Sequence, residues 1–241
     1  MIIAGALGFL IGLVAHDLAV QGLTVDRPLR PLQGVCPQCG HHRGWTHLRC
    51  PECGRTIQRE PVIALTSALM AVVFFDLFGV GWVLLAYLGF LTLSTALMVT
   101  DLEEFRIVDR LNIRGSVMLA ALLAVVALLS GDTEAILRGL GGTAAYFVGA
   151  LLMFMAVRGR GFGAGDVKLA PLLGLFTAFI SWGTLGWAVF ATALIGGVIA
   201  FGMIIAGAAR MKTELPYGPP MILGAWVAIV FAAIGTIPIP S

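Results

Sequence analysis

Residues 158–169 read R-G-R-G-F-G-A-G-D-V-K-L and form a basic, glycine-rich loop between two long apolar runs. Asp166 stands where the second run begins. An ionisable acid at the edge of a membrane helix is costly to keep, so a functional role is the default hypothesis. The glycines leave room for another backbone to lie close to that carboxylate. The alternative is a solvated acid that caps a helix; a second acid on the same side of the membrane would favour function.

The composition is that of a polytopic membrane protein. Of the 241 residues, 59% are hydrophobic and only 12% are charged, whereas soluble domains average about 25% charged residues. The net charge of +2 is too small to indicate a nucleic-acid partner. Residues 1–20 lack the basic start of a signal peptide, and His16-Asp17 stands where a cleavage site would need small residues. We therefore expect a retained first span.

The hydropathy pattern predicts an all-α fold with about eight transmembrane helices. A span needs roughly 17 or more apolar residues. Such runs fall near residues 2–20, 61–79, 81–100, 113–130, 137–157, 167–182, 184–207 and 219–237. The sixth run is short. We predict three parts: a first transmembrane helix (1–20), a cytoplasmic loop (21–60) and a seven-helix transmembrane core (61–241).

The positive charges alternate with these spans. Of the 15 Lys and Arg residues, 14 follow the first, third, fifth or seventh run, and only Arg138 lies in a loop of the other parity. Lys and Arg concentrate on the cytoplasmic side of membrane proteins. The pattern predicts an inner-membrane protein whose two termini both lie outside. Asp101, which ends the third run, and Asp166 then lie at the cytoplasmic face together, whereas Asp76 and Asp132 are ordinary residues near the opposite face.

Four cysteines form two pairs with the spacing C-x2-C-x10-C-x2-C, namely Cys36, Cys39, Cys50 and Cys53. Two residues between cysteines let both sulfurs point at one ion, and four thiolates suit tetrahedral zinc. Iron would use the same ligands. No ligand position is left open, so the metal is expected to be structural and to fold a loop that is too small for its own core.

The two aspartates fit one kind of chemistry. A water molecule held between them loses a proton to an ionised carboxylate, while the other carboxyl, protonated, polarises a peptide carbonyl. Asp166 lies at a helix N-terminus near Lys168, which favours Asp166 as the ionised partner and Asp101 as the protonated one. The pair titrates as a unit, so this assignment is open.

Four motifs resemble the type IV prepilin peptidases, a family of GxGD aspartic proteases. They are F-G-A-G-D-V-K-L at residues 162–169, T-D-L-E-E-F-R-I-V-D-R-L-N at 100–112, the two cysteine pairs between 36 and 53, and L-P-Y-G-P at 215–219. They occur in the family's order. The resemblance implies an aspartic endopeptidase that cleaves the basic leader of type IV prepilin or pseudopilin precursors at the cytoplasmic membrane face, with Asp101 and Asp166 as the catalytic pair.

Many members of that family also methylate the new N-terminus with S-adenosylmethionine, and the resemblance leaves this second activity open. Ala64 and His16 stand where the family commonly has glutamate and asparagine, and these departures bear on methyl transfer. Val108 stands where the family usually has proline. Asp109 matches a later acidic position of the family, and we expect it to be structural or electrostatic.

Two alternatives remain at this point. Presenilin-like proteases share a GxGD motif, but their tyrosine-aspartate pair and P-A-L motif are missing from this sequence, and preflagellin peptidases usually lack the cysteine pairs. The other alternative is a non-catalytic scaffold or transporter with a zinc-stabilised docking loop. Transporter acids usually lie near the middle of the bilayer, whereas Asp101 and Asp166 lie at its edge.

Overall fold

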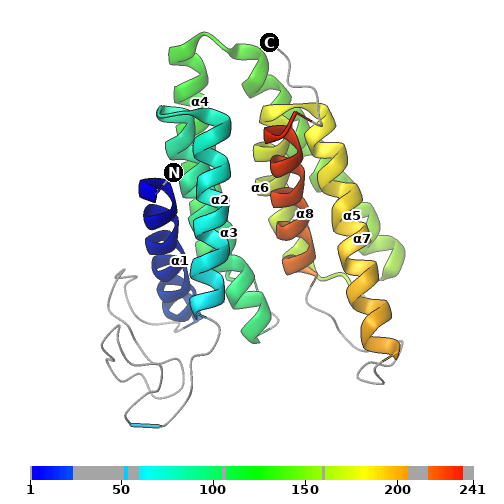
Figure 1. Cartoon of the computed structure of the whole chain (residues 1–241). Helices are drawn as coiled ribbons and strands as arrows, with labels where there is room; N and C mark the ends of the chain where they lie inside the picture. The colour runs from blue at the N-terminus through cyan, green and yellow to red at the C-terminus, as the bar shows by residue number, and fades with distance from the viewer. Residues whose placement is uncertain are drawn as a thin grey trace. The chain divides into compact units, whose positions relative to one another are not determined.

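The computed structural model describes residues 2–23, 52–53, 60–104, 107–158, 161–205 and 217–235. Regular structure in these ranges consists of eight α-helices (Figure 1). They are α1 (Ile2–Leu23), α2 (Glu60–Phe78), α3 (Trp82–Glu104), α4 (Asp109–Ser130), α5 (Thr133–Val157), α6 (Ala164–Ile180), α7 (Trp182–Ile205) and α8 (Gly218–Ala233). The all-α prediction is confirmed for these residues, and each predicted run matches one helix to within four residues at either end.

Within the described ranges, five helices are long and apolar enough to cross a membrane: α1, α3, α4, α5 and α7. The protein is therefore a multi-pass membrane protein. In α2 and α8 the apolar stretches are shorter. The 17-residue α6 carries Asp166 and Lys168 in its first turns. The count of eight spans stays a prediction, because three of the eight helices are too short or too polar to meet the length and composition of a span on their own.

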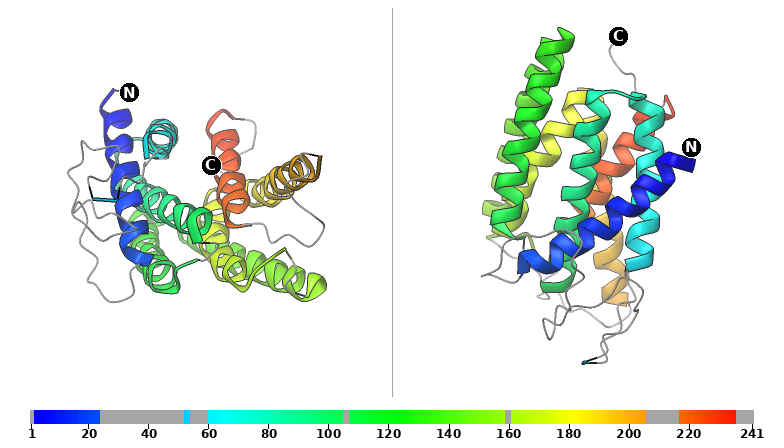
Figure 2. Two further views of the ribbon diagram at one scale, coloured as in Figure 1. Left: turned by 90° about the horizontal axis from the view of Figure 1, so that it is seen from below. Right: turned by 90° about the vertical axis from the view of Figure 1, so that its left-hand side faces the viewer.

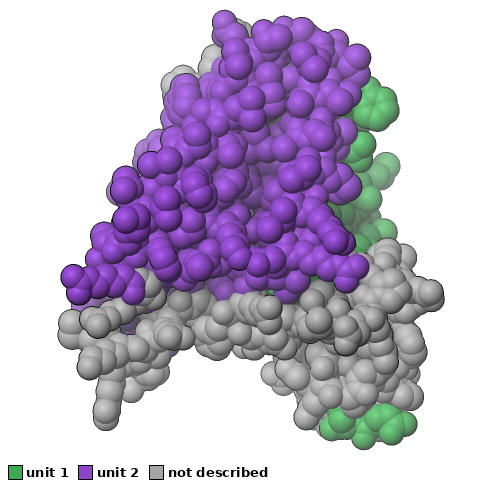
Figure 3. Space-filling model, turned by 180° about the vertical axis from the view of Figure 1, so that it is seen from behind, with its two compact units in different colours: residues 1–100 green, residues 101–241 purple. Residues whose placement is uncertain are grey.

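The chain divides into two compact units, Met1–Thr100 and Asp101–Ser241, which Figure 3 shows in green and purple. In the first unit, α1 packs along α2. The boundary falls inside α3, so the last turn of that helix belongs to the second unit. Asp101 and Asp166 consequently lie in the same unit.

Helix α6 forms the core of the second unit and contacts α4, α5, α7 and α8. Almost every residue from Asp166 to Ile180 is buried. The closest packing joins α5 to α6 and α7 to α8. Away from these contacts, α5 (yellow-green) and α7 (gold) diverge from one another, as the left panel of Figure 2 shows. Helix α6 is thereby packed by four other helices of its unit.

The opposite end of α6 explains the one basic residue that broke the charge alternation. Arg138 on α5 donates from Nε to the carbonyl oxygen of Ala178 at 3.1 Å and from Nη2 to that of Phe179 at 2.9 Å. The last carbonyl groups of a helix have no partners within the helix, and a cation there also matches the helix dipole. Asp132 also has a structural role, since its Oδ1 accepts the N–H of Ala135 at 2.9 Å and caps the start of α5.

Candidate active site

Asp166 lies in the first turn of α6 and is only 5% exposed. The backbone N–H of Gly163, the residue that precedes the helix, donates to Asp166 Oδ2 at 2.7 Å. An acid three residues into a helix commonly bonds back to the N-cap in this way. The sequence prediction that Asp166 stands at a helix N-terminus is confirmed, and the hydrogen bond fixes the direction of its carboxyl group.

The glycine-rich loop brings the segment between α3 and α4 next to this turn. Gly161 has a φ of +76°, which side-chain-bearing residues rarely adopt. A Cβ atom at Gly165 would lie 3.3 Å from the Cβ atom of Ile107, which is itself buried. Glycine at 165, in the first turn of α6, therefore allows close contact with Ile107, a residue of the motif that also contains Asp101.

Asp101 lies in the last turn of α3 and is also 5% exposed. The backbone N–H of Gly218, at the start of α8, donates to Asp101 Oδ2 at 3.1 Å. A Cβ atom at residue 218 would lie only 2.7 Å from that oxygen. Gly218 belongs to the L-P-Y-G-P motif, and the structure places its backbone N–H directly on one of the two carboxyl groups.

The two acids influence one another electrostatically. Burial raises the pKa of Asp166 to about 7; the hydrogen bond from Gly163 opposes this shift, and the charge of Asp101 adds to it. Burial also raises the pKa of Tyr217, and the charge of Asp166 contributes. Like-charged carboxyl groups that interact in this way hold a proton more tightly than isolated ones. Asp101, Asp166 and Tyr217 thus share one electrostatic environment.

Which of the two acids is ionised stays a prediction. We expected the helix N-terminus and Lys168 to keep Asp166 ionised. Burial acts in the opposite direction, since it raises the pKa of Asp166 from its ordinary value of 3.8 to about 7. Lys168 pairs elsewhere: its Nζ lies 2.6 Å from Asp109 Oδ2. Each acid accepts one backbone N–H, so hydrogen bonding does not distinguish them.

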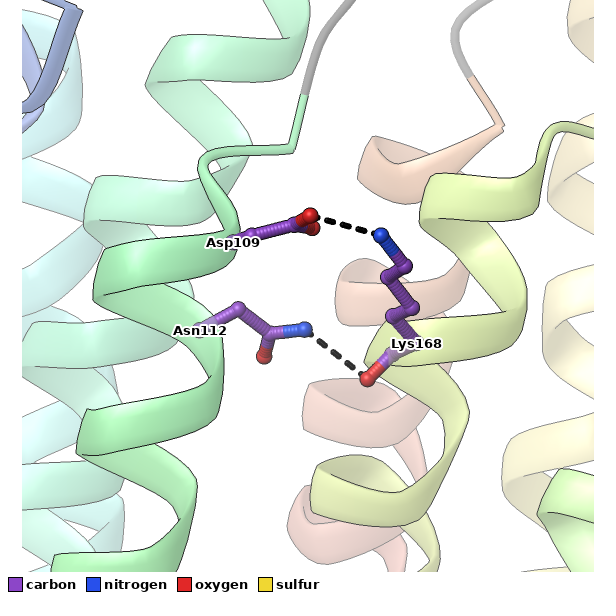
Figure 4. A network of polar contacts seen from close by, with 3 residues as sticks. All are labelled: Asp109, Asn112 and Lys168. Atoms are coloured by element: carbon purple, nitrogen blue, oxygen red, sulfur yellow. Dashed lines mark hydrogen bonds and ion pairs between the residues drawn. The ribbon is translucent and has the colours of Figure 1, made fainter. Parts of the chain in front are cut away.

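Asp109 and Asn112 connect the first turns of α4 to α6 (Figure 4). Asn112, only 1% exposed, donates from Nδ2 to the carbonyl oxygen of Lys168 at 2.8 Å. The Asp109–Lys168 ion pair joins the same two helices at the exposed edge of their contact. The structural or electrostatic role expected of Asp109 agrees with this pairing. The sequence analysis missed Asn112, whose place in the recognised motif was its only signal.

Most of the predicted metal site lies outside the described residues. Cys36, Cys39 and Cys50 are not among them, and Cys53 is described as exposed. In the parts that the structure does describe, no three His, Cys, Asp or Glu side chains are grouped to hold a metal. Zinc therefore stays a prediction from the cysteine spacing.

Comparison with known proteins supports the motif-based recognition. Residues 85–201 match the type IV leader peptidase family. A prepilin leader peptidase/N-methyltransferase from Aeromonas salmonicida is 28% identical over 217 residues, which cover 83% of this chain and 71% of the relative. The proteins with the same name from Pseudomonas aeruginosa and Bacillus subtilis are 25% and 27% identical, over 82% and 76% of this chain and 71% of each relative. No solved structure matches the chain.

The family match contains both aspartates and all of α4, α5 and α6. The matched relatives extend beyond it over most of the chain. Residues 85–201 therefore match the type IV leader peptidase family, and the chain is a multi-pass membrane protein similar to the prepilin leader peptidases.

Proposed function

We propose that this protein is an aspartic endopeptidase that removes the basic leader from type IV prepilin or pseudopilin precursors. The observation that carries the proposal is the pair of buried acids, each bonded to a backbone N–H: Asp101 to Gly218 and Asp166 to Gly163. A backbone donor cannot rotate away as a side chain can. The pair is thus held in place before a substrate arrives, which is what catalysis by positioned groups requires.

The proposed reaction uses one proton shared by the two carboxyl groups. The ionised carboxylate takes a proton from water while the water oxygen attacks the peptide carbonyl carbon, and the protonated carboxyl donates to the carbonyl oxygen. When the tetrahedral intermediate collapses, the C–N bond breaks and the departing nitrogen takes a proton. The products are a free carboxyl group on the leader and a new amino terminus.

The placement of the acids favours a protease over a transporter. Asp101 occupies the last turn of α3 and Asp166 the first turn of α6, so both lie at helix ends. Transporters hold their coupling acids near the middle of the bilayer. A precursor with a basic leader and an apolar following segment presents its cleavage point at the membrane boundary. We place that boundary at the cytoplasmic face of the inner membrane because Lys and Arg concentrate in the loops on that side.

We also propose that Cys36, Cys39, Cys50 and Cys53 hold a structural zinc ion. The support is their spacing in two C-x2-C pairs. Metal analysis of the purified protein is expected to give one zinc per chain. Replacement of all four cysteines by serine is expected to remove the zinc; a metal content that survives the replacement would contradict the assignment.

N-methylation of the new amino terminus is a second candidate activity, favoured by the names of the matched relatives, which include N-methyltransferase. S-adenosylmethionine would supply the methyl group. One experiment tests both activities: mass spectrometry of a purified prepilin after incubation with the protein, with and without S-adenosylmethionine. We expect a cut between the basic leader and the apolar segment. A further 14 Da on the new terminus would show methylation, and an intact precursor would contradict the peptidase assignment.

A further inference from the structure

A cavity of about 380 Å³ lies in the second unit between α5 and α7. Its floor is formed by buried residues of α5, α7, α8 and the glycine-rich loop: Tyr146, Ala150, Phe162, Leu185, Thr192 and Met221. Gly149 and Met153 of α5, and Val189 and Ala193 of α7, form an exposed rim. The cavity is thus buried at its base and open at the rim formed by α5 and α7.

The cavity offers an apolar surface. Its lining is almost entirely alanine, leucine, valine, methionine and aromatic side chains. The two hydroxyl groups at its floor, on Tyr146 and Thr192, lie 3.3 Å apart and bond to one another. That hydrogen bond gives each hydroxyl group a partner within the protein, so the floor is less polar than two free hydroxyl groups would make it. The apolar lining of the cavity therefore favours a hydrocarbon occupant.

Two residues that line the cavity are sequence neighbours of the glycines that bond the two acids. Phe162 directly precedes Gly163, which bonds Asp166, and Tyr217 directly precedes Gly218, which bonds Asp101. The Phe162 and Tyr217 rings pack edge to face with centroids 5.2 Å apart, and both line the cavity. Consecutive Cα atoms are only about 3.8 Å apart, so a chain whose peptide bond reaches the two acids has its next residues at the cavity.

We propose that this cavity binds the apolar segment of the substrate that immediately follows the cleaved bond, and so acts as a specificity pocket for that segment. The proposal rests on the peptidase function proposed above. A peptide held at the two acids continues from a charged leader into an apolar stretch, and the cavity is apolar, of a size typical for binding sites, and adjacent. Binding there would place the junction between the two parts of the precursor at the carboxyl groups.

Gly149 provides a test with little risk to folding. A Cβ atom at this rim position meets nothing within 4 Å, and leucine is a better helix former than glycine. Gly149→Leu should therefore fold and project a side chain into the cavity mouth. Gly186→Leu is the matched control, since Gly186 is an exposed glycine of α7 with equally open surroundings and does not line the cavity.

The assay compares two purified precursors: the natural sequence and one whose first four residues after the cut are alanine. We expect the wild-type protein and Gly186→Leu to prefer the natural precursor by about tenfold or more in kcat/KM, a typical discrimination for an apolar pocket. In Gly149→Leu this preference is expected to fall below about twofold, chiefly through a lower kcat/KM for the natural precursor, with an unchanged melting temperature.

The possible outcomes separate the two proposals. If Gly149→Leu keeps the wild-type preference, the cavity holds only lipid and the inference is wrong. Equal losses on both precursors would show general damage and would also overturn it. If the wild-type protein cleaves neither precursor, the peptidase function itself fails; if it cleaves both without preference, only the pocket fails.

Discussion

Helices α4 and α6 both begin with an acid in their first turn, Asp109 and Asp166, but the two acids have different surroundings. The Asp109 side chain is 52% exposed and pairs with Lys168 at 2.6 Å. Asp166 is 5% exposed, bonds the N–H of Gly163, and has a pKa raised to about 7 by burial. Position on a helix is the same in both cases, and burial is not.

The comparison shows what makes an acid suitable for catalysis. An exposed carboxylate paired with lysine stabilises little. A buried carboxyl group near a second acid can both hold and release a proton near neutral pH, which is the property that acid–base catalysis needs. The same residue type thus joins two helices at one site and is a catalytic candidate at the other.

The largest expected difference is in activity. Asp166→Asn should reduce prepilin cleavage by about a thousandfold or more, because asparagine cannot exchange a proton. Asp109→Asn should reduce it by less than tenfold, because Asp109 only helps to hold α4 against α6. Initial rates of leader removal by the purified variants measure both. Equal losses of cleavage rate in the two variants would contradict the proposed difference between Asp109 and Asp166.

Gly218→Ala is expected to reduce cleavage activity less than Asp166→Asn does. The added methyl group would lie 2.7 Å from Asp101 Oδ2 and force the carboxyl group to move. We expect kcat to fall by about 10- to 100-fold with little change in KM, since a misplaced catalytic group costs rate more than binding. Gly197→Ala is the control, because a Cβ atom there meets nothing within 4 Å. A Gly218→Ala variant with wild-type kcat would show that Asp101 does not need this backbone contact.

The pH dependence of cleavage should also distinguish Asp166 from Asp109. With a pKa of about 7, Asp166 is protonated below neutral pH and ionised above it. If one shared proton is required, the rate should decline as the pH rises above about 7, and Asp109→Asn should keep the same decline. Burial penalises the ionised form, so wild type should lose stability as the pH rises from the ordinary pKa of 3.8 to about 7. Asp166→Asn should therefore gain thermal stability relative to wild type over that range, with no further gain above it. A rate that increases steadily to pH 9 would rule out the shared proton.

The smallest effect is expected from the ion pair itself. Lys168→Met removes the partner of Asp109, and both side chains are about half exposed. Such pairs contribute about 0.2–1 kcal/mol, so the melting temperature should change by only a few degrees. Asn112→Ala removes a buried hydrogen bond between the same two helices and should lower the melting temperature more than Lys168→Met does. The opposite order would mean that the exposed pair, not the buried amide, holds α4 to α6.

Much of this architecture could be predicted from the sequence. Long apolar runs separated by charged loops fix where helices occur, because a run of that length has few other ways to satisfy its backbone. The end of one run and the start of another gave Asp101 and Asp166 their positions. The charge alternation predicted one membrane face for both, and the structure places both in one unit with their charges coupled.

The contacts that the sequence did not predict are backbone contacts and long-range partners. The N–H of Gly218 and the pairing of Lys168 with Asp109 depend on how helices pack, and periodicity does not specify packing partners. The role of Arg138 could not be predicted either, because its partners lie about 40 residues away in the sequence, on α6. The cavity between α5 and α7 likewise exists only once the two helices diverge.

The central claim is that Asp101 and Asp166 act as one catalytic unit, and non-additivity tests it most directly. Single-turnover cleavage of a prepilin would be measured with purified Asp101→Asn, Asp166→Asn and the double variant. Residues that act together lose about as much when one is removed as when both are. We predict that each single variant falls to the same residual rate as the double variant. A single variant that keeps more than about a tenth of the wild-type rate, or losses that multiply in the double variant, would contradict the account.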